Sequence, residues 1–311
     1  MKIFCNPANV FPCRFRGSIA TIGIFDGVHS GHRTILNQVV QRAKQLGKKS
    51  LVITFDPHPA VVLTPEEAPP LIMSFQHRLK VLEKIGFDVC WMIHFTKKVA
   101  HQEAWRFVRE LLVEKLGISE VWIGNGFRFG RGNLGNVELL KLLGQCYGFS
   151  VHEIDLVYLE KQRVSSTKIR QLVEKGKLKS AERLLGHPVS ILGRVISGKR
   201  LGKKIGFPTA NLNAHHEAIP PSGVYVVWGI VNEKRFQGVV NIGVCPTVNK
   251  RKNKKTMPTI EVHLMDFKGN LYGKNLELCF VKKLRNEKQF PSLSSLANQI
   301  QKDIQSANLH L

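Results

Sequence analysis

The sequence predicts two consecutive domains: an α/β Rossmann-like domain, then a mainly antiparallel β-barrel with a C-terminal helix. In the first half, short apolar runs alternate with amphipathic helical patterns, as in right-handed βαβ units around a parallel sheet. After about residue 186, strand-like runs follow one another with only turn residues between them. The chain of 311 residues is long enough for two cores, and the expected domains are residues 1–185 and 186–311.

The first half is expected to contain four buried strands connected by helices. The strands are the short apolar runs Ile19–Ile24, Ser50–Phe55, Val89–Phe95 and Val121–Gly124. Helices are expected over Arg33–Leu46 and Glu103–Leu116, where apolar residues recur at helical spacing and a glycine follows the last turn. Parallel strands end at one edge of the sheet, so the residues that follow them are candidates for ligand binding.

The second half is expected to contain five closely spaced strands and one terminal helix. The strands are Val189–Ile196, Val224–Val231, Phe236–Ile242, Thr259–Met265 and Leu276–Val281, and the helix is Leu293–Gln305. Turns are clearest at Asn232–Lys234 and Lys268–Asn270. The basic run Lys250–Lys255 lies between two strands and is either a solvated loop tip or a patch that contacts nucleic acid or membrane.

The composition is that of a globular protein with an unusual charge. Hydrophobic residues make up 43% of the chain, and 46 Lys and Arg against 23 Asp and Glu give a formal net charge of +23. Such a field attracts nucleic acid, anionic membranes or phosphate-rich substrates. The sequence carries no aromatic–basic interleaving, zinc-ligand spacing or RNA-binding signature, so no nucleic-acid partner is expected.

The chain is expected to be cytoplasmic and to have no membrane partner. Its 6 cysteines show neither metal-type spacing nor a disulfide framework. The start of the chain, MKIFCNPANVFPCRFRG, is interrupted by prolines and lacks a long apolar core, so no signal peptide is expected. The apolar stretch Leu51–Thr64 contains Asp56, His58 and two prolines and does not fit a membrane span. Oligomeric state is not indicated by the sequence.

A phosphate-binding segment, GIFDGVHSGH at residues 23–32, is predicted between the first strand and the first helix. Gly27 and Gly31 let the backbone approach a ligand, and free N–H groups at a helix start point at anionic oxygens. His29 and His32 can face one phosphate group and stabilise the charge that develops on it when it is attacked. The other candidate nucleotide-binding residues of this segment are Gly23, Phe25 and Asp26.

The spacing H-x-G-H resembles that of the adenylyl-transferring nucleotidyltransferase superfamily, which includes class I aminoacyl-tRNA synthetases. This resemblance implies attack on the α-phosphate of a nucleoside triphosphate and leaves the acceptor open.

Two further segments follow the same logic. RVSSTKIR, residues 163–170, has three hydroxyls before an expected helix over Lys168–Glu174. The hydroxyls either cap this helix or form a clamp for the β- and γ-phosphates with the neighbouring cations; the candidates are Arg163, Ser165, Ser166, Thr167 and Arg170.

TFDPHP, residues 54–59, either places Asp56 and His58 at the ligand edge of the sheet or forms a tight exit turn.

The second half contains a glycine- and lysine-rich flap, GKRLGKKIGFPTAN at residues 198–211. Gly193–Lys199 has Walker A spacing, but Arg200 replaces the Ser or Thr and no helical pattern follows, so a P-loop is rejected. Thr209 and Asn211 carry hard oxygen ligands for Mg²⁺, and Lys203 and Lys204 can meet triphosphate charge. Glu261, which shares a strand face with His263, can act as a general base. The other flap residues expected to contact nucleotide are Gly198, Gly206 and Pro208.

Together these segments resemble the bifunctional bacterial riboflavin kinase/FAD synthetase family over essentially the whole chain. Ten motifs occur in the family's order: GIFDGVHSGH, TFDPHP, GFRFG (126–130), RVSSTKIR, LLGHP (184–188), GFPTAN (206–211), SGVY (222–225), NIGVCPT (241–247), EVHLMDF (261–267) and LYGK (271–274). The resemblance implies a nucleotidyltransferase domain followed by a riboflavin kinase domain.

The resemblance also implies two reactions. The second domain phosphorylates riboflavin to FMN with Mg²⁺ and ATP, with Thr209 and Asn211 on the metal and Glu261 as base. The first domain transfers AMP from ATP to FMN and releases pyrophosphate, with His29 and His32 stabilising the transition state. Riboflavin, FMN, FAD and ATP are thus the implied small-molecule partners.

The chain departs from the family pattern at two positions. Gly126 stands where family members carry Asp or Asn, with Asn125 one place earlier as a candidate substitute, and Lys203 stands where they carry Arg. The first departure leaves open a chain that acts as riboflavin kinase alone. The sequence is also compatible with a different adenylyl- or cytidylyltransferase fused to an unrelated barrel, and with a nucleic-acid-binding protein.

Overall fold

The computed structural model describes residues 1–5, 15–155, 157–159, 162–198, 202, 205–214, 217–243 and 258–310. It divides into two compact units, and each is described separately. Unit 1 consists of Met1–Pro69 and Phe75–Ser166, and unit 2 consists of Pro70–Ser74 and Thr167–Leu311. The short segment Pro70–Ser74 thus belongs to unit 2, although the chain on both sides of it belongs to unit 1.

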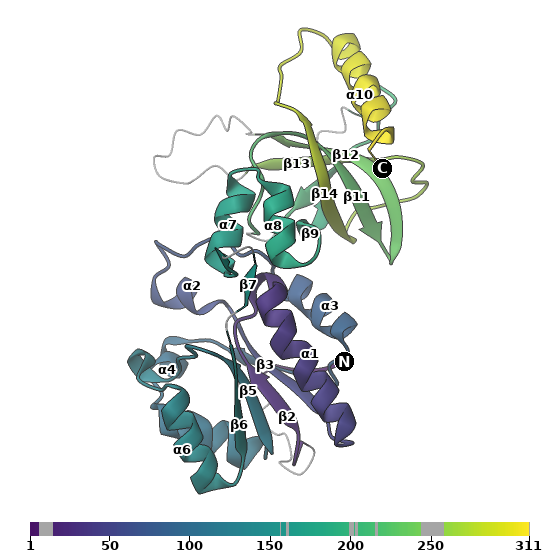
Figure 1. Cartoon of the computed structure of the whole chain (residues 1–311). Coiled ribbons are helices and arrows are strands. Elements are labelled where there is room, and N and C mark those ends of the chain that lie inside the picture. Colours follow the sequence, from purple (N-terminus) through teal and green to yellow (C-terminus); the bar gives the residue numbers. More distant parts are fainter. Residues whose placement is uncertain are drawn as a thin grey trace. The chain divides into compact units, whose positions relative to one another are not determined.

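Unit 1 is built on a six-stranded parallel sheet with the order β1-β4-β3-β2-β5-β6 (Figure 1). The strands are β1 Lys2–Cys5, β2 Ile19–Ile22, β3 Ser50–Asp56, β4 Val89–His94, β5 Glu120–Gly124 and β6 Ser150–Ile154. From β2 the chain adds β3 and β4 on one side, then β5 and β6 on the other. The strand order therefore reverses between β2 and β5, and ligands of such sheets bind beside this switch point, at the carboxyl ends of the strands.

Helices cover both faces of this sheet. Figure 1 shows α1 and α3 on one face and α4 and α6 on the other. The helices of unit 1 are α1 Ser30–Gln45, α2 Pro59–Leu63, α3 Phe75–Ile85, α4 Lys97–Ala100, α5 Ala104–Phe107 and α6 Val137–Tyr147. Each long helix points an apolar stripe at the sheet: Leu36 and Val39 of α1 and Leu82 of α3 are fully buried.

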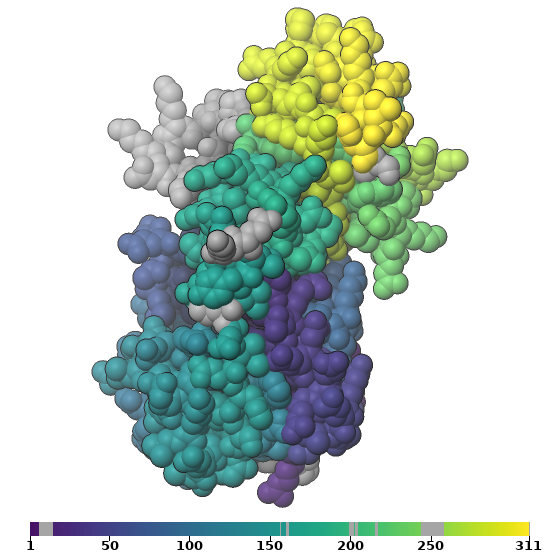
Figure 2. All heavy atoms as spheres, viewed as in Figure 1, coloured from purple at the N-terminus to yellow at the C-terminus, as the bar shows by residue number. Residues whose placement is uncertain are grey.

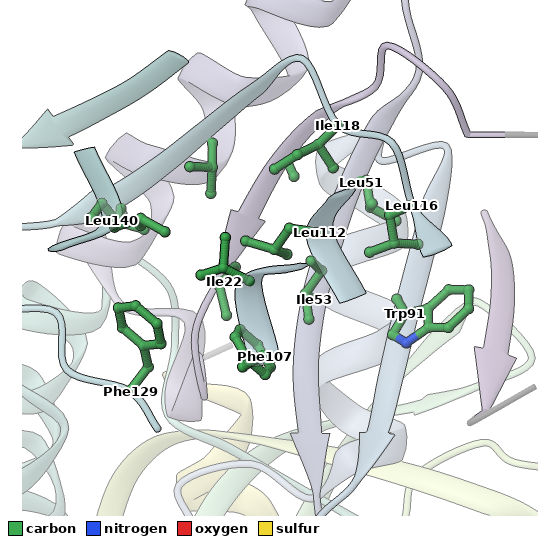
Figure 3. Packing of buried hydrophobic residues seen from close by; sticks show 14 of the residues in the cluster. Ile22, Leu51, Ile53, Trp91, Phe107, Leu112, Leu116, Ile118, Phe129 and Leu140 are labelled. Atoms are coloured by element: carbon green, nitrogen blue, oxygen red, sulfur yellow. The ribbon is translucent and has the colours of Figure 1, made fainter. Parts of the chain in front are cut away.

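The main core of unit 1 lies between the strands and the helical segment from α5 onward. Figure 3 shows Ile22 and Ile53 of the sheet facing Phe107 and Leu112 of that segment. Trp91 of β4 is 1% exposed at one side of this cluster. Parallel strands covered on both faces are apolar along their whole length, which explains why they stand out in the sequence as short apolar runs.

The helix expected over Glu103–Leu116 differs from the prediction in its hydrogen bonding. Only Ala104–Phe107 is α-helical, and a π-helix runs over Val108–Lys115. Phe107 and Leu112 are five residues apart and both buried. The i→i+5 bonding of a π-helix brings residues at that spacing onto one side. The apolar spacing at this point fits the wider turn.

Unit 2 is built on a closed antiparallel barrel with the order β10-β13-β12-β11-β14-β9. Its strands are β9 Ser190–Ile196, β10 Ala210–Asn213, β11 Gly223–Val231, β12 Lys234–Gly243, β13 Thr259–Leu264 and β14 Asn275–Arg285. The hairpin β11–β12 turns at Asn232 and Glu233, both with positive φ, as the sequence predicts. The described part of unit 2 also contains the helices α7 Ser166–Glu174, α8 Leu178–Leu185 and α10 Leu293–Asn308.

The C-terminal helix α10 lies on the outside of the barrel, and Figure 2 shows it (yellow) at the surface of its unit. Ala307 is fully buried against Val224, Val226 and Val239 of the barrel. Asp303, 5% exposed, accepts hydrogen bonds from Nε and Nη2 of Arg285, the shortest 2.7 Å. Apolar packing around Ala307 and a buried ion pair thus hold the helix on the barrel.

The segment Pro70–Ser74 is tied into unit 2 by a buried carboxylate. Glu217 is 2% exposed; its Oε1 accepts from the N–H of Ser74 at 2.8 Å and its Oε2 from the N–H of Leu192 at 2.9 Å. Arg170 Nε donates to the carbonyl oxygen of Pro70 at 2.6 Å. We call Pro70–Ser74 the strap.

The predicted fold class is confirmed, with differences at element boundaries. Strand β2 ends at Ile22 rather than Ile24, α1 begins at Ser30 rather than Arg33, and β14 continues to Arg285 rather than Val281. Elements that the sequence did not predict include the strands β1, β6 and β10, the helices α3, α6 and α8, and the short helices α2 and α4. The basic run Lys250–Lys255, Lys203 and Lys204 lie outside the described residues. No helix within the described ranges is long and apolar enough to cross a membrane.

Candidate active sites

The loop after β2 has an unusual backbone. Phe25 and Val28 have φ of 52° and 39°, and Gly27 between them has φ of 80°. Left-handed values are uncommon for a phenylalanine and rarer for a β-branched valine, so the surrounding structure must enforce them. Asp26 in the same loop is 3% exposed. The result is a tight turn that carries the chain from the end of β2 to the first residue of α1.

His29 and His32 form a stacked pair at the start of α1. His29 is the N-cap residue: its Nδ1 accepts from the backbone N–H of His32 at 3.2 Å. The centroids of the two rings lie 3.6 Å apart, with an angle of 14° between the ring planes. The ring of Phe25 packs edge-on against His32, with 5.3 Å between the ring centroids. Gly31 leaves room for this stack, because a Cβ there would lie 3.3 Å from the His29 ring. The structure therefore brings both predicted catalytic histidines together.

The environment keeps His32 neutral. Burial lowers the pKa of His32 well below its usual value of 6.5, and the neighbouring His29 and Arg78 lower it further. Its Nδ1 is buried without a hydrogen-bond partner among the residues that the structure describes. A neutral imidazole with a buried ring nitrogen is suited to exchange a hydrogen bond with a ligand oxygen.

The RVSSTKIR segment lies beside this loop through Ser166, whose Oγ donates to the carbonyl oxygen of Asp26 at 2.9 Å. Helix α7 begins at Ser166, so Ser166 and Thr167 are its first two residues rather than hydroxyls before it. The expected start at Lys168 was wrong, because Ser and Thr are also favourable in a first turn that needs side-chain partners. Their hydroxyls still lie at a helix N-terminus, where anions bind favourably.

The cations of this segment differ in exposure. Arg163 is exposed on the short strand β8, Gln162–Arg163, and Ser165 is half-buried. Arg170 is 8% exposed and its Nε is bonded to Pro70 in the strap. The structure thus bonds Ser166 to the loop of residues 23–32, which we call the histidine loop. It bonds the Nε of Arg170 to the strap.

The TFDPHP segment follows β3, the neighbour of β2 in the sheet. His58 caps α2, since its Nδ1 accepts from the N–H of Ala60 at 3.1 Å. Burial raises the pKa of Asp56, and the charges of Arg78 and His94 partly oppose this effect. Asp56 is the last residue of β3, at the carboxyl edge of the sheet, and the capping of α2 by His58 also fits the exit-turn interpretation.

Arg78 of α3 is a residue of this edge that the sequence motifs did not reveal. It is 2% exposed and donates to backbone oxygens at the ends of β2 and β3. A signal was present: Phe75, Arg78 and Leu82 share one face of an amphipathic helix, and an arginine on an apolar face is unusual.

Asn125 and Gly126 follow β5, at the switch point of the sheet. Asn125 is exposed, and its N–H donates to the carbonyl oxygen of Ile154 at 2.8 Å. Gly126 has φ of 82°, and a Cβ built there meets nothing within 4 Å. Asn and Asp tolerate this conformation better than other side chains, so a glycine here preserves the turn and removes only the side chain.

In unit 2 the barrel register brings the predicted metal ligand and base together. Asn211 of β10 is the cross-strand partner of Glu261 on β13, and Asn241 of β12 is its partner on the other side. Glu261 and His263 are half-buried while Ile260 and Val262 are buried. The three polar residues Asn211, Glu261 and Asn241 therefore lie on the outer face of the barrel, in one row across three strands.

The flap glycines lie against the predicted metal ligands. A Cβ on Gly198 would collide with the amide of Asn211, and a Cβ on Gly202 would lie 2.9 Å from Oγ1 of Thr209. Only glycine permits this close approach.

The end of the flap contacts the strand that carries the predicted base. Gly206 has φ of 85°, which a glycine adopts without strain. Two residues later, the carbonyl oxygen of Pro208 lies 2.9 Å from Nδ1 of His263. The flap is thereby attached to β13, two residues from Glu261.

Two cavities of unit 2 border these residues. One of about 480 Å³ is lined by Pro208 and Thr209 and by residues of the loop Phe267–Tyr272. The other, of about 590 Å³, is lined by Phe207, His263 and Met265 and by residues of α10. Both have the size of small-molecule sites.

The donors of the second site suit a magnesium ion. Thr209 offers a hydroxyl, Asn211 an amide and Glu261 a carboxylate, and the last two are paired in register. Mg²⁺ in nucleotide sites is held by one or two such protein oxygens together with phosphate oxygens and water. The residues present therefore fit this ion.

Two sequence families match the chain. The one described as FAD synthetase matches residues 12–168, and the one described as riboflavin kinase matches residues 185–311. A Haemophilus influenzae protein named bifunctional riboflavin kinase/FMN adenylyltransferase is 39% identical over 94% of this chain and 94% of its own length. An Escherichia coli protein of the same name is 36% identical over 97% of this chain and 96% of its own.

Among solved structures, a crystal structure of a protein named as a macrolide-efflux protein from Streptococcus pneumoniae is similar to this chain. Its TM-score is 0.82, at 25% identity, over 99% of each chain. The likeness supports the fold, and that name belongs to the Streptococcus protein alone.

Proposed function

The chain belongs to the bifunctional riboflavin kinase/FMN adenylyltransferase family, and from this premise we propose how its residues divide the work. The chain phosphorylates riboflavin to FMN with ATP, and adenylylates FMN to FAD with release of pyrophosphate. Nothing in the comparisons favours a kinase-only chain, because both families match. We assign the adenylyltransferase to residues 1–185 and the kinase to residues 186–311.

In the adenylyltransferase, the FMN phosphate attacks the α-phosphate of ATP and pyrophosphate leaves. His29 and His32 donate hydrogen bonds to the α-phosphate oxygens as negative charge grows on them. Backbone N–H groups at the start of α1 hold the same phosphate, and Arg163, Ser165, Ser166 and Thr167 hold the leaving β- and γ-phosphates. The stacking of the two histidine rings supports this arrangement, since it fixes both against one side of the loop.

In the kinase, Glu261 accepts the proton of the terminal ribityl hydroxyl of riboflavin as that oxygen attacks the γ-phosphate. Thr209 and Asn211 bind Mg²⁺, which neutralises charge on the transferring phosphate when it is bound with ATP. The flap residues Gly198 and Lys203 cover the phosphates. The observation that carries this assignment is the cross-strand pairing of Asn211 with Glu261, because it supports placing the base next to the metal.

The two cavities suit the two substrates. The cavity at Thr209 takes the nucleotide, since it borders a predicted metal ligand. The cavity at His263 takes the flavin, because Phe207, Met265 and Ile304 provide apolar contact for a flat ring while Gln237, Gln301 and Asn308 provide amides for its polar edge. Glu261 shares a strand face with His263 and is therefore close to this cavity.

The reaction is expected to run in the cytoplasm, where ATP is available and thiols stay reduced. Among the described cysteines, Cys5, Cys90 and Cys146 are free thiols. Riboflavin, FMN, FAD and ATP are the proposed partners, and no nucleic acid is proposed among them.

The test is to supply the purified chain with riboflavin, ATP and Mg²⁺ and resolve the flavins by chromatography. FMN should appear first and FAD after it. With FMN and ATP supplied, His32→Ala should lower FAD formation by about 100-fold or more, as loss of a transition-state hydrogen-bond donor does. The same variant should form FMN from riboflavin at the normal rate.

Substitutions in the barrel should show the reverse pattern. Glu261→Ala and Asn211→Ala should abolish FMN formation and leave FAD formation from supplied FMN intact. Accumulation of FMN without FAD by the unmodified chain would contradict the bifunctional assignment, and loss of both activities in each variant would contradict the division of residues.

A further inference from the structure

Arg78 carries a buried charge that the reactions described above do not use. It lies on α3 and is 2% exposed. Its Nη1 donates to the carbonyl oxygen of Ile24 and to Oγ1 of Thr54, and its Nη2 donates to the carbonyl oxygen of Phe55 at 2.9 Å. One planar guanidinium thus holds three acceptors in a fixed geometry.

These acceptors lie at the ends of two adjacent strands. Ile24 is two residues beyond β2 and directly precedes the left-handed loop, while Thr54 and Phe55 are among the last three residues of β3. Thr54 Oγ1 also donates to the carbonyl oxygen of Ile24 at 3.2 Å. Arg78 therefore joins the start of the histidine loop to the start of the TFDPHP turn.

The guanidinium also balances two carboxylates of the same edge. Burial lowers the pKa of Arg78, and the negative charges of Asp26 in the loop and Asp56 at the end of β3 partly oppose this effect. The three charged side chains therefore influence one another at the edge where β2 and β3 end.

The free-energy cost of burying the guanidinium of Arg78 indicates that this residue does more than fill space in the core. A buried guanidinium loses its hydration, and an apolar side chain of similar size is often at least as stable in such a position. The apolar face of α3 would accept a methionine or leucine in this place. The charge therefore serves the geometry of the loops that it ties.

We propose that Arg78 is a positioning residue for adenylyl transfer: it holds the ends of β2 and β3 together and so fixes His29 and His32 relative to the nucleotide. This inference rests on the proposed function of unit 1. It predicts that Arg78 acts through the histidine loop and not by touching the substrate.

The first test compares Arg78→Met with the unmodified chain in FAD formation from FMN and ATP. The variant should lose about 100-fold in kcat, as expected when reacting groups are displaced by about 1 Å. Its KM for ATP should change less than about 5-fold, since the interaction lost is one made in the transition state. Formation of FMN from riboflavin should remain unchanged.

Two further variants separate positioning from stability. Arg78→Lys keeps the charge but has no planar fork, and should recover only part of the rate, to about 10-fold below normal. Leu82→Ala removes a fully buried side chain from the same helix and should keep FAD formation within about 3-fold of normal, even though it lowers the Tm. Lys80→Met, a substitution of another cation on α3 that is not buried, is the matched control and should have no effect.

Hydrogen–deuterium exchange gives a readout that does not depend on activity. Arg78→Met should speed exchange at residues 23–32 and 54–59 and leave that of β5 and β6 unchanged. If the unmodified chain made no FAD, the proposed function of unit 1 would be contradicted. The exchange rates would still show whether Arg78 holds the ends of β2 and β3 together.

Three results would overturn the proposal: full FAD formation by Arg78→Met, full recovery by Arg78→Lys, or an equal kcat loss in Leu82→Ala. Folding of unit 1 is judged by tryptophan fluorescence in a Trp228→Phe background, in which the remaining tryptophans are all in unit 1. If Arg78→Met does not fold, the FAD formation of Arg78→Lys compared with that of Leu82→Ala decides between positioning and stability.

Discussion

Among the individual residues, His32 combines two properties that rarely occur together. Its ring is stacked on a second histidine, and its Nδ1 is buried without a partner in the described part of the chain. A buried polar atom without a hydrogen bond destabilises the fold by about 1–3 kcal/mol. Such an arrangement persists at sites where a ligand supplies the missing bond.

His32 should make unit 1 less stable in mild acid. The unfolded chain protonates this ring near pH 6.5, whereas the folded chain resists protonation to a lower pH because its pKa is lowered. Below about pH 6.5 the unfolded state therefore binds more protons, and the free energy of unfolding falls as the pH falls. Each unit by which the pKa is lowered corresponds to about 1.4 kcal/mol.

The measurement is the Tm at pH 7.5, 6.5 and 5.5, followed by tryptophan fluorescence in a Trp228→Phe background. Three of the 4 tryptophans then remain, all in unit 1. His32→Gln should flatten the decline of Tm below pH 6.5, while His101→Gln, at an exposed position, should not. An unchanged slope in His32→Gln would show that the ring does not resist protonation.

Single residues also mark the limit of what the sequence could predict. His29 and His32 were predicted because both lie within four consecutive residues of one motif, HSGH at residues 29–32. Arg78 was missed because it acts on backbone oxygens of segments more than 20 residues away, as its 23-residue separation from Phe55 illustrates. No local pattern records such a contact.

Among the helices and strands, α10 contributes both to the stability of unit 2 and to the cavity proposed for the flavin. Gln301, Ile304 and Asn308 line that cavity, and Asp303 between them is bonded to Arg285 of β14 at 2.7 Å. The helix starts with a capping box at Ser292 and Ser295, which fixes its first turn. The buried ion pair fixes its other end.

Asp303→Asn should loosen this helix on the barrel. Breaking a buried pair from one side costs about 3 kcal/mol, because Arg285 is left without its counter-charge. The KM for riboflavin should rise because three cavity residues lie on the same helix, whereas FAD formation from supplied FMN should not change. Thermal unfolding and kinase kinetics are the measurements, with Lys302→Gln, exposed on α10, as control; an unchanged KM would contradict the role of α10 in the cavity.

Elements were predicted best where the pattern was strong. Buried strands such as β3 and β11 are continuous apolar runs and were found within a residue or two at each end. The four-residue strand β10 follows the flap and is too short to show a period of two. The π-helix was predicted as an ordinary helix because hydrophobic spacing does not distinguish the two types of hydrogen bonding.

Over the full chain, the two reactions are assigned to separate sets of residues. The histidine pair belongs to unit 1, and the Asn211–Glu261 pair belongs to unit 2. FMN is the product of one reaction and the substrate of the other. The reactions can therefore be carried out by different copies of the chain.

A mixture of His32→Ala and Glu261→Ala proteins should form FAD from riboflavin and ATP, although neither protein does so alone. FAD should appear after a lag while FMN accumulates in solution, with the lag shortening as the amount of His32→Ala protein increases. Time courses resolved by chromatography would measure this. No FAD in the mixture would mean that FMN passes between the reactions only within one chain.

The strap determines how the two units can be separated by cutting the chain. The polypeptide passes between the units at residues 69/70, 74/75 and 166/167, so no single cut separates them. A gene fragment that encodes only residues 167–311 lacks Ser74, and with it the hydrogen bond from the N–H of Ser74 to the Oε1 of Glu217. A single recombination point at 166/167 therefore separates the strap from the residues of unit 2 that bind it.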